Sequence, residues 1–222
     1  MKLIIAIDGP AAAGKSTVAK RVAKQLNITY IDTGAMYRAF TLYVINQGIN
    51  PENQAESEAC IPDVHIELKP TGEIFLNDQD VSNEIREPHV SSQVSYIASY
   101  KAIRLALVEL QRKMAEKQSV VMDGRDIGTF VLPQANVKIY QIASVETRAV
   151  RRYEENLEKG IQTSLESVEE ELRKRDYIDS HREFAPLKPA PDSVLIDTSF
   201  MKVDEVVHRI LEIVEKKRIV GV

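Results

Sequence analysis

Short apolar runs alternate with stretches of helical periodicity along most of this chain. The apolar runs predict buried strands at residues 2–7, 28–31, 119–122, 137–142 and 193–196. The periodic stretches predict helices at residues 15–25, 36–46, 91–116, 145–159, 164–180 and 203–217. Strands that alternate with helices favour an α/β fold, so we predict a five-stranded parallel sheet flanked by helices.

Two segments depart from this alternation. Residues 63–81 alternate apolar and polar positions around the turn sequence Pro70-Thr71-Gly72, which predicts a hairpin with a third short strand. We therefore expect an antiparallel insertion over about residues 60–90. Residues 183–194 contain three prolines and predict a surface connector rather than a helix. The length of 222 residues suits one domain that spans residues 1–222.

Composition and charge limit the classes of molecule that this protein is expected to bind. The net charge of -4 gives no overall attraction to a nucleic acid polymer or an anionic membrane, so we expect small-molecule substrates. No apolar run reaches the roughly 18 residues that cross a bilayer. The single cysteine, Cys60, excludes an intrachain disulfide and favours a reducing cytoplasm. We also expect a monomer, because nothing in the sequence indicates an obligate partner.

A glycine-rich segment directly follows the first predicted strand. Gly9, Gly14, Lys15 and Ser16 match the pattern G-x-x-x-x-G-K-[ST], between a buried strand and an amphipathic helix. Glycines let main-chain N–H groups curl around phosphate oxygens, so we predict a nucleotide-phosphate loop with Lys15 on the β- and γ-phosphates and the Ser16 hydroxyl on Mg²⁺. The predicted loop comprises Gly9, Pro10, Ala11, Ala12, Ala13, Gly14, Lys15, Ser16 and Thr17. A glycine-rich turn with a surface lysine is the structural alternative.

The loop alone does not separate GTPases, motors, small kinases and nucleotide sensors. The chain has no N-K-x-D sequence of the kind that reads guanine in GTPases, and motors are usually larger or oligomeric. These features favour a small kinase.

Charged residues follow two other predicted strands. Arg38 lies shortly after the second strand, where it could hold a phosphate with two hydrogen bonds. Asp123, Arg125 and Asp126 follow the third strand, and ligands of doubly wound sheets gather at that edge. We predict Asp123 beside the metal, as a ligand or one step removed from it, and Arg125 on phosphate. A surface helix arginine and a salt-bridged loop are the alternatives.

Two further groups of charges have helical spacing. Arg175, Asp179 and Arg182 lie at i, i+4 and i+7, so one helical face could present all three to the nucleotide. Arg148 and Arg152 lie one turn apart on the preceding predicted helix. A solvated charged face is the alternative for both groups.

Five segments, in this order, together resemble the bacterial cytidylate kinases, a group of nucleoside monophosphate kinases: GPAAAGKST, DTGAMYR, DVSNEIR, DGRDIGT and RDYIDSHREFAPL. The resemblance spans nearly the whole chain. It implies a P-loop kinase with a helical lid over about residues 148–185, on which Arg148 and Arg152 are lid candidates. It also implies ATP-dependent phosphorylation of CMP and dCMP by direct in-line transfer with Mg²⁺.

The same resemblance assigns roles to residues of the acceptor site. It implies that Arg38, Arg125 and Arg182 grip the monophosphate and, with Lys15, form the catalytic set. It further implies that Ser95, Arg104 and Asp126 read the cytosine edge. The remaining CMP contacts that it implies are Thr33, Arg175 and Asp179.

Phosphoryl transfer depends more on positioning and cations than on a base, so we expect no general base. The four histidines lack metal-ligand spacing, and we interpret them as structural or surface residues: His65, His89, His181 and His208. We expect the insertion and lid to close when both substrates bind, which excludes water. A P-loop kinase for another small acceptor, and a catalytically silent nucleotide-binding regulator, are the alternatives.

Overall fold

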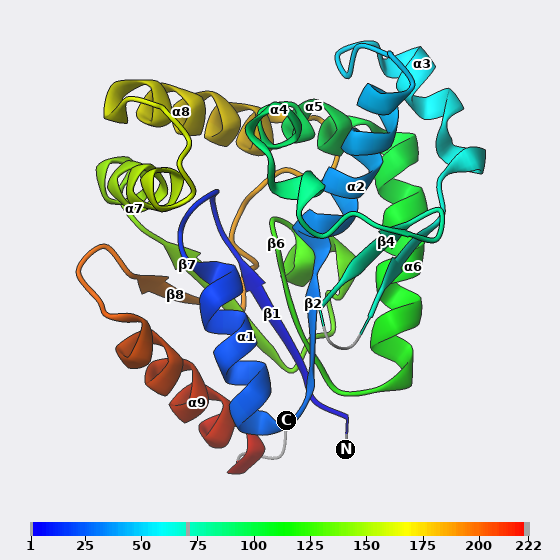
Figure 1. The fold of residues 1–222 in the computed structure, drawn as a ribbon. Helices are drawn as coiled ribbons and strands as arrows, with labels where there is room; N and C mark the ends of the chain where they lie inside the picture. Colours follow the sequence, from blue (N-terminus) through cyan, green and yellow to red (C-terminus); the bar gives the residue numbers. More distant parts are fainter. Residues whose placement is uncertain (1, 70–71, 220–222) are drawn as a thin grey trace.

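A five-stranded parallel sheet forms the centre of the molecule (Figure 1). The structure, a computed structural model, describes residues 2–69 and 72–219. In sheet order the strands are β2 (Thr29–Asp32), β6 (Val120–Gly124), β1 (Ile4–Asp8), β7 (Val137–Ile142) and β8 (Val194–Asp197). Every adjacent pair is parallel, so the five predicted strands and the α/β class are confirmed.

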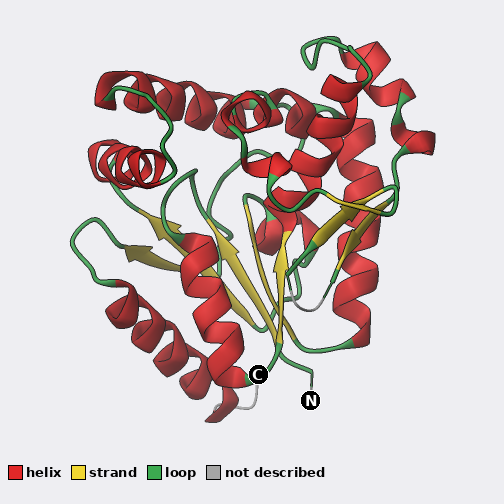
Figure 2. Cartoon of the chain, in the orientation of Figure 1, coloured by secondary structure: helices red, strands yellow, loops and turns green. Residues whose placement is uncertain are grey.

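Helices cover both faces of this sheet, as Figure 2 shows. Alternate residues of β1 point to opposite faces, because the side-chain period of a strand is two. Ile5 and Ile7 pack with Val18 on one face, and Ala6 packs with Val108 on the other. The first face is covered by α1 (Lys15–Leu26) and α9 (Val203–Ile219), and the second by α6 (Lys101–Lys117).

The insertion contains a three-stranded antiparallel sheet, as predicted. Its strands are β3 (Ile66–Leu68), β4 (Ile74–Leu76) and β5 (Gln79–Asp80). Pro70 and Thr71 of the predicted turn lie outside the described residues. Ile66 and Ile74 pack against Phe40 of α2 (Thr33–Asn46), so the insertion is anchored to the helix that follows β2. The short helices around it are α3 (Gln54–Ala59), η1 (Ile61–Asp63), η2 (Glu84–Arg86) and α4 (Pro88–Ser91).

The single helix predicted over residues 91–116 is wrong. The chain forms α4, α5 (Val94–Ser99) and α6, with extended backbone at Tyr100 between α5 and α6. The phenol of Tyr100 donates to the carbonyl of Pro51 at 2.9 Å. The break leaves the Ala98 carbonyl free of helical bonds, and the guanidinium groups of Arg104 and Arg182 donate to it at 2.8 and 3.3 Å. Tertiary hydrogen bonds thus replace the helical ones that periodicity predicts.

Helix α2 begins at Thr33, three residues before its predicted start at Met36. Asp32 caps it, since its side chain accepts a hydrogen bond from the main-chain N–H of Ala35 at 2.8 Å. The end of β2 therefore passes directly into the helix.

Helices α7 (Val145–Glu158) and α8 (Leu165–His181) pack together next to the loop that joins β1 and α1 (Figure 1). Ala11 of that loop packs with Ala149 of α7 and with Val168 and Leu172 of α8. The proline-rich connector after α8 contains no helix, as predicted. Within residues 2–69 and 72–219, no helix combines the length and apolar character needed to cross a membrane.

Candidate active site

The glycine-rich loop, residues 9–14, joins β1 to α1. A Cβ atom at Gly9 would lie 1.9 Å from the carbonyl oxygen of Gln141, so only glycine fits against β7. Gly14 precedes the first turn of α1 with a φ of 85°, a left-handed conformation that glycine adopts without strain. Gly9 is thus required by a tertiary contact and Gly14 by its own backbone conformation.

Lys15 and Ser16 begin α1 at the edge of the sheet. The Lys15 ammonium donates to the carbonyl of Pro10 at 2.6 Å. Burial, and next the neighbouring charge of Arg125, lower the pKa of Lys15 to about 7. The Ser16 hydroxyl donates to Asp123 at 2.8 Å, and the Tyr30 phenol donates to the other carboxylate oxygen of Asp123 at 2.8 Å. The end of β6 is thereby tied to α1 and β2.

The Ser16 hydroxyl and the Asp123 carboxylate are hard oxygen donors, which suit Mg²⁺. Among the described residues, no group of three or more His, Cys, Asp or Glu side chains is placed to hold a metal by itself. Mg²⁺ usually takes one or two protein ligands and completes its shell with water and substrate phosphates. Two oxygen donors beside a phosphate loop therefore fit this ion.

Thr33 also contacts the end of β6, since its hydroxyl donates to the main-chain oxygen of Asp123 at 2.7 Å.

Two cavities adjoin at the loop. The larger has a volume of about 640 Å³ and the smaller about 130 Å³. They share a wall made of Ala12, Lys15, Ser16, Asp32, Arg38, Arg152 and Arg175. Three guanidinium groups and one ammonium thus lie between two spaces, which is an arrangement for binding anions from both sides.

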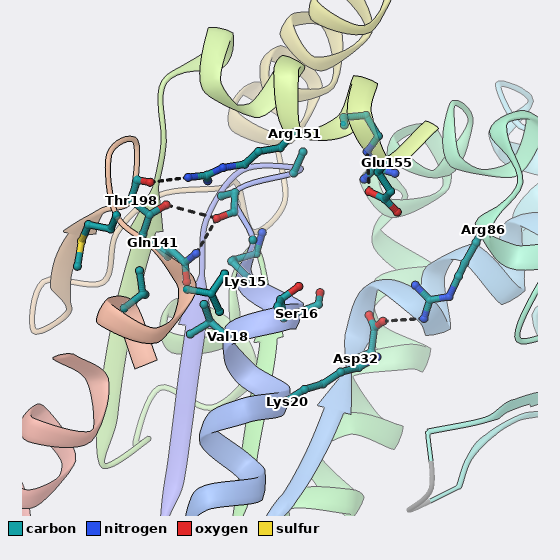
Figure 3. Close-up of a pocket in the computed structure, with 18 of the residues that line it drawn as sticks. Lys15, Ser16, Val18, Lys20, Asp32, Arg86, Gln141, Arg151, Glu155 and Thr198 are labelled. Carbon is teal, nitrogen blue, oxygen red and sulfur yellow. Dashed lines mark hydrogen bonds and ion pairs between the residues drawn. The ribbon is translucent and has the colours of Figure 1, made fainter. Parts of the chain in front are cut away.

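The larger cavity extends from the loop toward the segment after β8 (Figure 3). Its outer wall consists of Arg151, Thr198, Met201, Lys202, Val203 and Val206. The Arg151 guanidinium donates to the carbonyl of Thr198 at 2.6 Å, which ties α7 to this segment. Sequence reasoning named none of these residues. Thr198 directly follows the last strand, so the rule that ligands gather at strand ends was the available signal.

The smaller cavity contains the residues implied for the acceptor base. Arg104 is 1% exposed and donates to Asp126 at 2.5 Å. Asp126 also lies 3.7 Å from the guanidinium of Arg182. Ser95 and Thr33 line the same cavity and are buried. Residues from α2, α5, α6 and the end of β6 therefore meet in one buried polar cluster.

Most arginines of this region face a carboxylate. Arg125 donates to Asp179 at 2.8 Å, and Arg38 donates to Asp32 at 3.2 Å. Figure 3 shows that Arg86 also reaches Asp32, at 3.7 Å. These pairs hold the guanidinium groups around the cavities.

Arg175 is the exception to this pairing. Its nearest carboxylate contact is with the half-exposed Glu171 at 3.9 Å, and its buried Nε has no hydrogen-bond partner among the described residues. Burial, and next the positive charge of Arg125, lower its pKa to about 10. Because Arg175 lines both cavities, an anion there would satisfy a guanidinium that the protein pairs only weakly, with Glu171 at 3.9 Å.

The structure corrects the predicted face formed by Arg175, Asp179 and Arg182. Helix α8 ends at His181, and Arg182 follows it in extended conformation. Its guanidinium turns to the carbonyl of Ala185 at 2.5 and 2.8 Å. All three predicted residues still line the smaller cavity, but the chain reversal after α8, rather than helical spacing, places Arg182.

The two lid candidates differ in their surroundings. Arg152 lines both cavities. Arg148 is buried, lines neither cavity, and donates to the carbonyls of Ala143 and Ala11 at 2.9 and 3.2 Å and to Asp176 at 2.6 Å. Arg148 thus connects α7, α8 and the phosphate loop.

Asp8 is a further buried carboxylate that sequence reasoning did not place in the site. It accepts hydrogen bonds from the main-chain N–H groups of Ile127 and Gly128, each at 2.7 Å. Burial raises its pKa to about 7 in spite of these donors. It fixes the start of η3 (Ile127–Val131), a turn of π-helix that directly follows Asp126. An aspartate that ends an apolar strand was the signal in the sequence.

The family model described as cytidylate kinase matches residues 5–216. A cytidylate kinase of Anoxybacillus flavithermus is 50% identical over 219 residues, with 97% of each chain covered. A cytidylate kinase of Bacillus licheniformis is 51% identical over 220 residues, again with 97% of each covered.

Solved structures support the fold at low sequence identity. An uncharacterized protein from Eubacterium ventriosum has a TM-score of 0.54 and 15% identity, with 97% of this chain and 99% of that chain covered. A gluconokinase from Sinorhizobium meliloti has a TM-score of 0.50 and 12% identity, with 99% and 98% covered. These similarities carry the fold alone.

Proposed function

Because the chain belongs to the cytidylate kinase family, we propose that it transfers the γ-phosphoryl group of ATP to CMP and dCMP. One observation carries the proposal: the two cavities share a wall that contains Lys15, Arg38 and Arg175. A triphosphate in the larger cavity and a monophosphate in the smaller one would meet at these cations. Direct in-line transfer requires this juxtaposition of donor and acceptor.

In the proposed donor site the loop N–H groups and Lys15 bind the phosphates, with the positive end of α1 directed at them. The adenine lies toward the apolar surface of Met201, Val203 and Val206. Ser16 and Asp123 would hold Mg²⁺, which when bound neutralises charge on the phosphate oxygens.

In the proposed acceptor site a carboxylate and a guanidinium read the base. Cytosine presents an amino donor beside ring and carbonyl acceptors, which complement Asp126 and Arg104. Uracil presents an oxygen where cytosine has the amino group, and that oxygen would face the Asp126 carboxylate. Ser95 adds a hydroxyl from α5 to the same cavity.

The acceptor phosphate needs no base, since it is already ionised. Arg38, Arg125, Arg175 and Arg182 surround its site and stabilise charge that spreads over the peripheral oxygens during transfer. The smaller cavity is below the roughly 300–1,000 Å³ of common ligand sites, so the acceptor half widens to admit CMP and then closes around it. Lid closure over about residues 148–185 would exclude water.

We propose that one chain acts as a cytoplasmic monomer, because a single copy supplies both cavities and its one cysteine, Cys60, forms no intrachain disulfide. A rate assay with ATP and Mg²⁺ against CMP, dCMP, UMP, AMP and shikimate tests the function. CMP and dCMP should be phosphorylated fastest. Faster turnover of AMP or shikimate would point to a different P-loop kinase, and ATP binding without turnover of any acceptor would point to a silent regulator.

A further inference from the structure

Three carbonyl groups of the phosphate loop accept hydrogen bonds from side chains. The Pro10 carbonyl accepts from Lys15 at 2.6 Å, and the Ala11 carbonyl accepts from Arg148 at 3.2 Å. The Ala13 carbonyl accepts from the side-chain amide of Gln141 at 2.6 Å. Lys15 and Arg148 already have roles as a phosphate ligand and a link between helices, whereas Gln141 has none.

Gln141 lies on β7 and is 1% exposed. Its amide must present the NH₂ group to Ala13, because a carbonyl oxygen can only accept a hydrogen bond. A buried amide costs free energy that a leucine or methionine would not. The hydrogen bond to Ala13 satisfies its amide nitrogen, whereas its Oε1 has no hydrogen-bond partner among the described residues.

The plane of the Ala13–Gly14 peptide determines where the N–H group of Gly14 points. A trans peptide is planar, so the N–H of Gly14 points opposite to the carbonyl of Ala13. The described residues contain no cis peptide bond. With the Ala13 carbonyl held by Gln141, the Gly14 N–H points away from the Gln141 amide. Ala13, Gly14 and Gln141 all line the larger cavity, so the peptide lies at its wall.

The hydroxyl of Thr198 approaches the same Ala13 oxygen at 3.4 Å, and Figure 3 shows both side chains converging on the loop. Thr198 donates at the shorter distance of 2.9 Å to the Ile142 carbonyl. Gln141 therefore makes the dominant contact. Gly9 and Gly14 also lie against Gln141, since a Cβ at Gly14 would sit 3.6 Å from its amide nitrogen.

We propose that Gln141 is a positioning residue for the donor phosphates, acting through the Ala13–Gly14 peptide to aim the Gly14 N–H at a phosphate oxygen. This inference rests on the proposed use of the loop for ATP. It concerns the phosphates alone, so its effect is separable from binding of the adenine and of CMP.

Inorganic tripolyphosphate is the probe that isolates this effect, because it has no base or sugar. In Gln141→Met, a side chain of similar length without a donor replaces the amide. By titration calorimetry we expect the affinity for tripolyphosphate and for ATP to fall by the same factor, about tenfold. The affinity for CMP should stay within about twofold, and KM should rise for ATP but not for CMP.

Gln111→Met is the matched control. Gln111 is also fully buried, but it lies on α6 and lines neither cavity. Its loss should leave tripolyphosphate affinity within about twofold of the parent value. Gln141→Glu, which faces the Ala13 oxygen with a carboxylate, should weaken tripolyphosphate binding more than Gln141→Met.

A measurement on the unaltered protein covers the case in which the variants fail to fold. The amide resonance of Gly14 should shift strongly on titration with tripolyphosphate. An unmoved Gly14 resonance at saturation would overturn the proposal. So would unchanged tripolyphosphate affinity in Gln141→Met, or equal losses for tripolyphosphate and CMP. Failure of the unaltered protein to bind tripolyphosphate or ATP would instead overturn the proposed function.

Discussion

Arg125 at the end of β6 donates a hydrogen bond of 2.8 Å to Asp179 on α8, across 54 residues of sequence. Both side chains line the smaller cavity. A carboxylate therefore holds a guanidinium that we assign to the acceptor phosphate. The pair orients Arg125, and it joins the sheet to the second helix of the proposed lid.

Loss of the Asp179 charge should weaken both the fold and acceptor binding. Burial alone would raise the pKa of Asp179, but Arg125, Arg182 and Arg175 hold it below its ordinary value. In Asp179→Asn we expect the unfolding free energy at pH 7 to fall by about 1.5–3 kcal/mol. The stabilisation is present above about pH 4 and is lost as pH falls further, so urea unfolding at pH 7 and pH 3.5 should show a smaller difference at the lower pH.

Lys15→Ala should abolish most phosphoryl transfer while the fold is retained. We expect kcat to fall by at least about 100-fold, because a cation aimed at the transferred group is lost. The substitution removes a buried charge whose pKa is already lowered to about 7, so thermal unfolding should change little. Substantial remaining turnover in a folded variant would refute the role.

Asp126→Asn should relax discrimination between cytosine and uracil. A side-chain amide can donate to the uracil oxygen that a carboxylate repels, so the ratio of kcat/KM for CMP over UMP should drop by about tenfold or more. Steady-state kinetics with both nucleotides measures this ratio. Asp192→Asn is the control, because Asp192 is a largely exposed carboxylate paired with Lys138. An unchanged ratio in Asp126→Asn would remove Asp126 from base recognition.

Asp8 predicts an unusual dependence of stability on pH. Its pKa is raised from 3.8 to about 7 in the fold, so the folded chain keeps a proton that the unfolded chain releases. Stability contributed by protonated Asp8 is therefore lost as pH rises from about 4 to 7. Relative to Asp8→Asn, the parent should lose stability steadily as pH rises between pH 5 and 6.5. Parallel stability curves from denaturant unfolding would show that Asp8 does not titrate in this range.

Binding of both nucleotides should compact the molecule. Arg152 of α7 and Arg175 of α8 line the wall between the two cavities, so phosphates bound on both sides would draw these helices inward. Small-angle scattering should give a smaller radius of gyration with ATP analogue and CMP together than with either alone. Equal radii in all states would argue against lid closure.

The strands and the phosphate loop were predictable because their signals are local. An apolar run marks each strand, and the glycines of the motif, followed by Lys15 and Ser16, mark the loop. The helix break at Tyr100 was not predictable in this way. The Ala98 carbonyl there accepts hydrogen bonds from both Arg104 and Arg182, and Arg182 is distant in sequence.

The amino-acid sequence by itself determined the order of the five sheet strands along the chain and the position of the phosphate loop. Tertiary structure alone decided which carboxylate holds each arginine, the position of Arg182 beyond α8, and the wall that Thr198 and its neighbours give the larger cavity. The physical reason is the distance along the sequence over which each interaction acts. Helical and strand periodicity arises between residues a few positions apart, whereas ion pairs such as Arg125–Asp179 form only after the sheet and α8 bring distant segments within hydrogen-bonding distance.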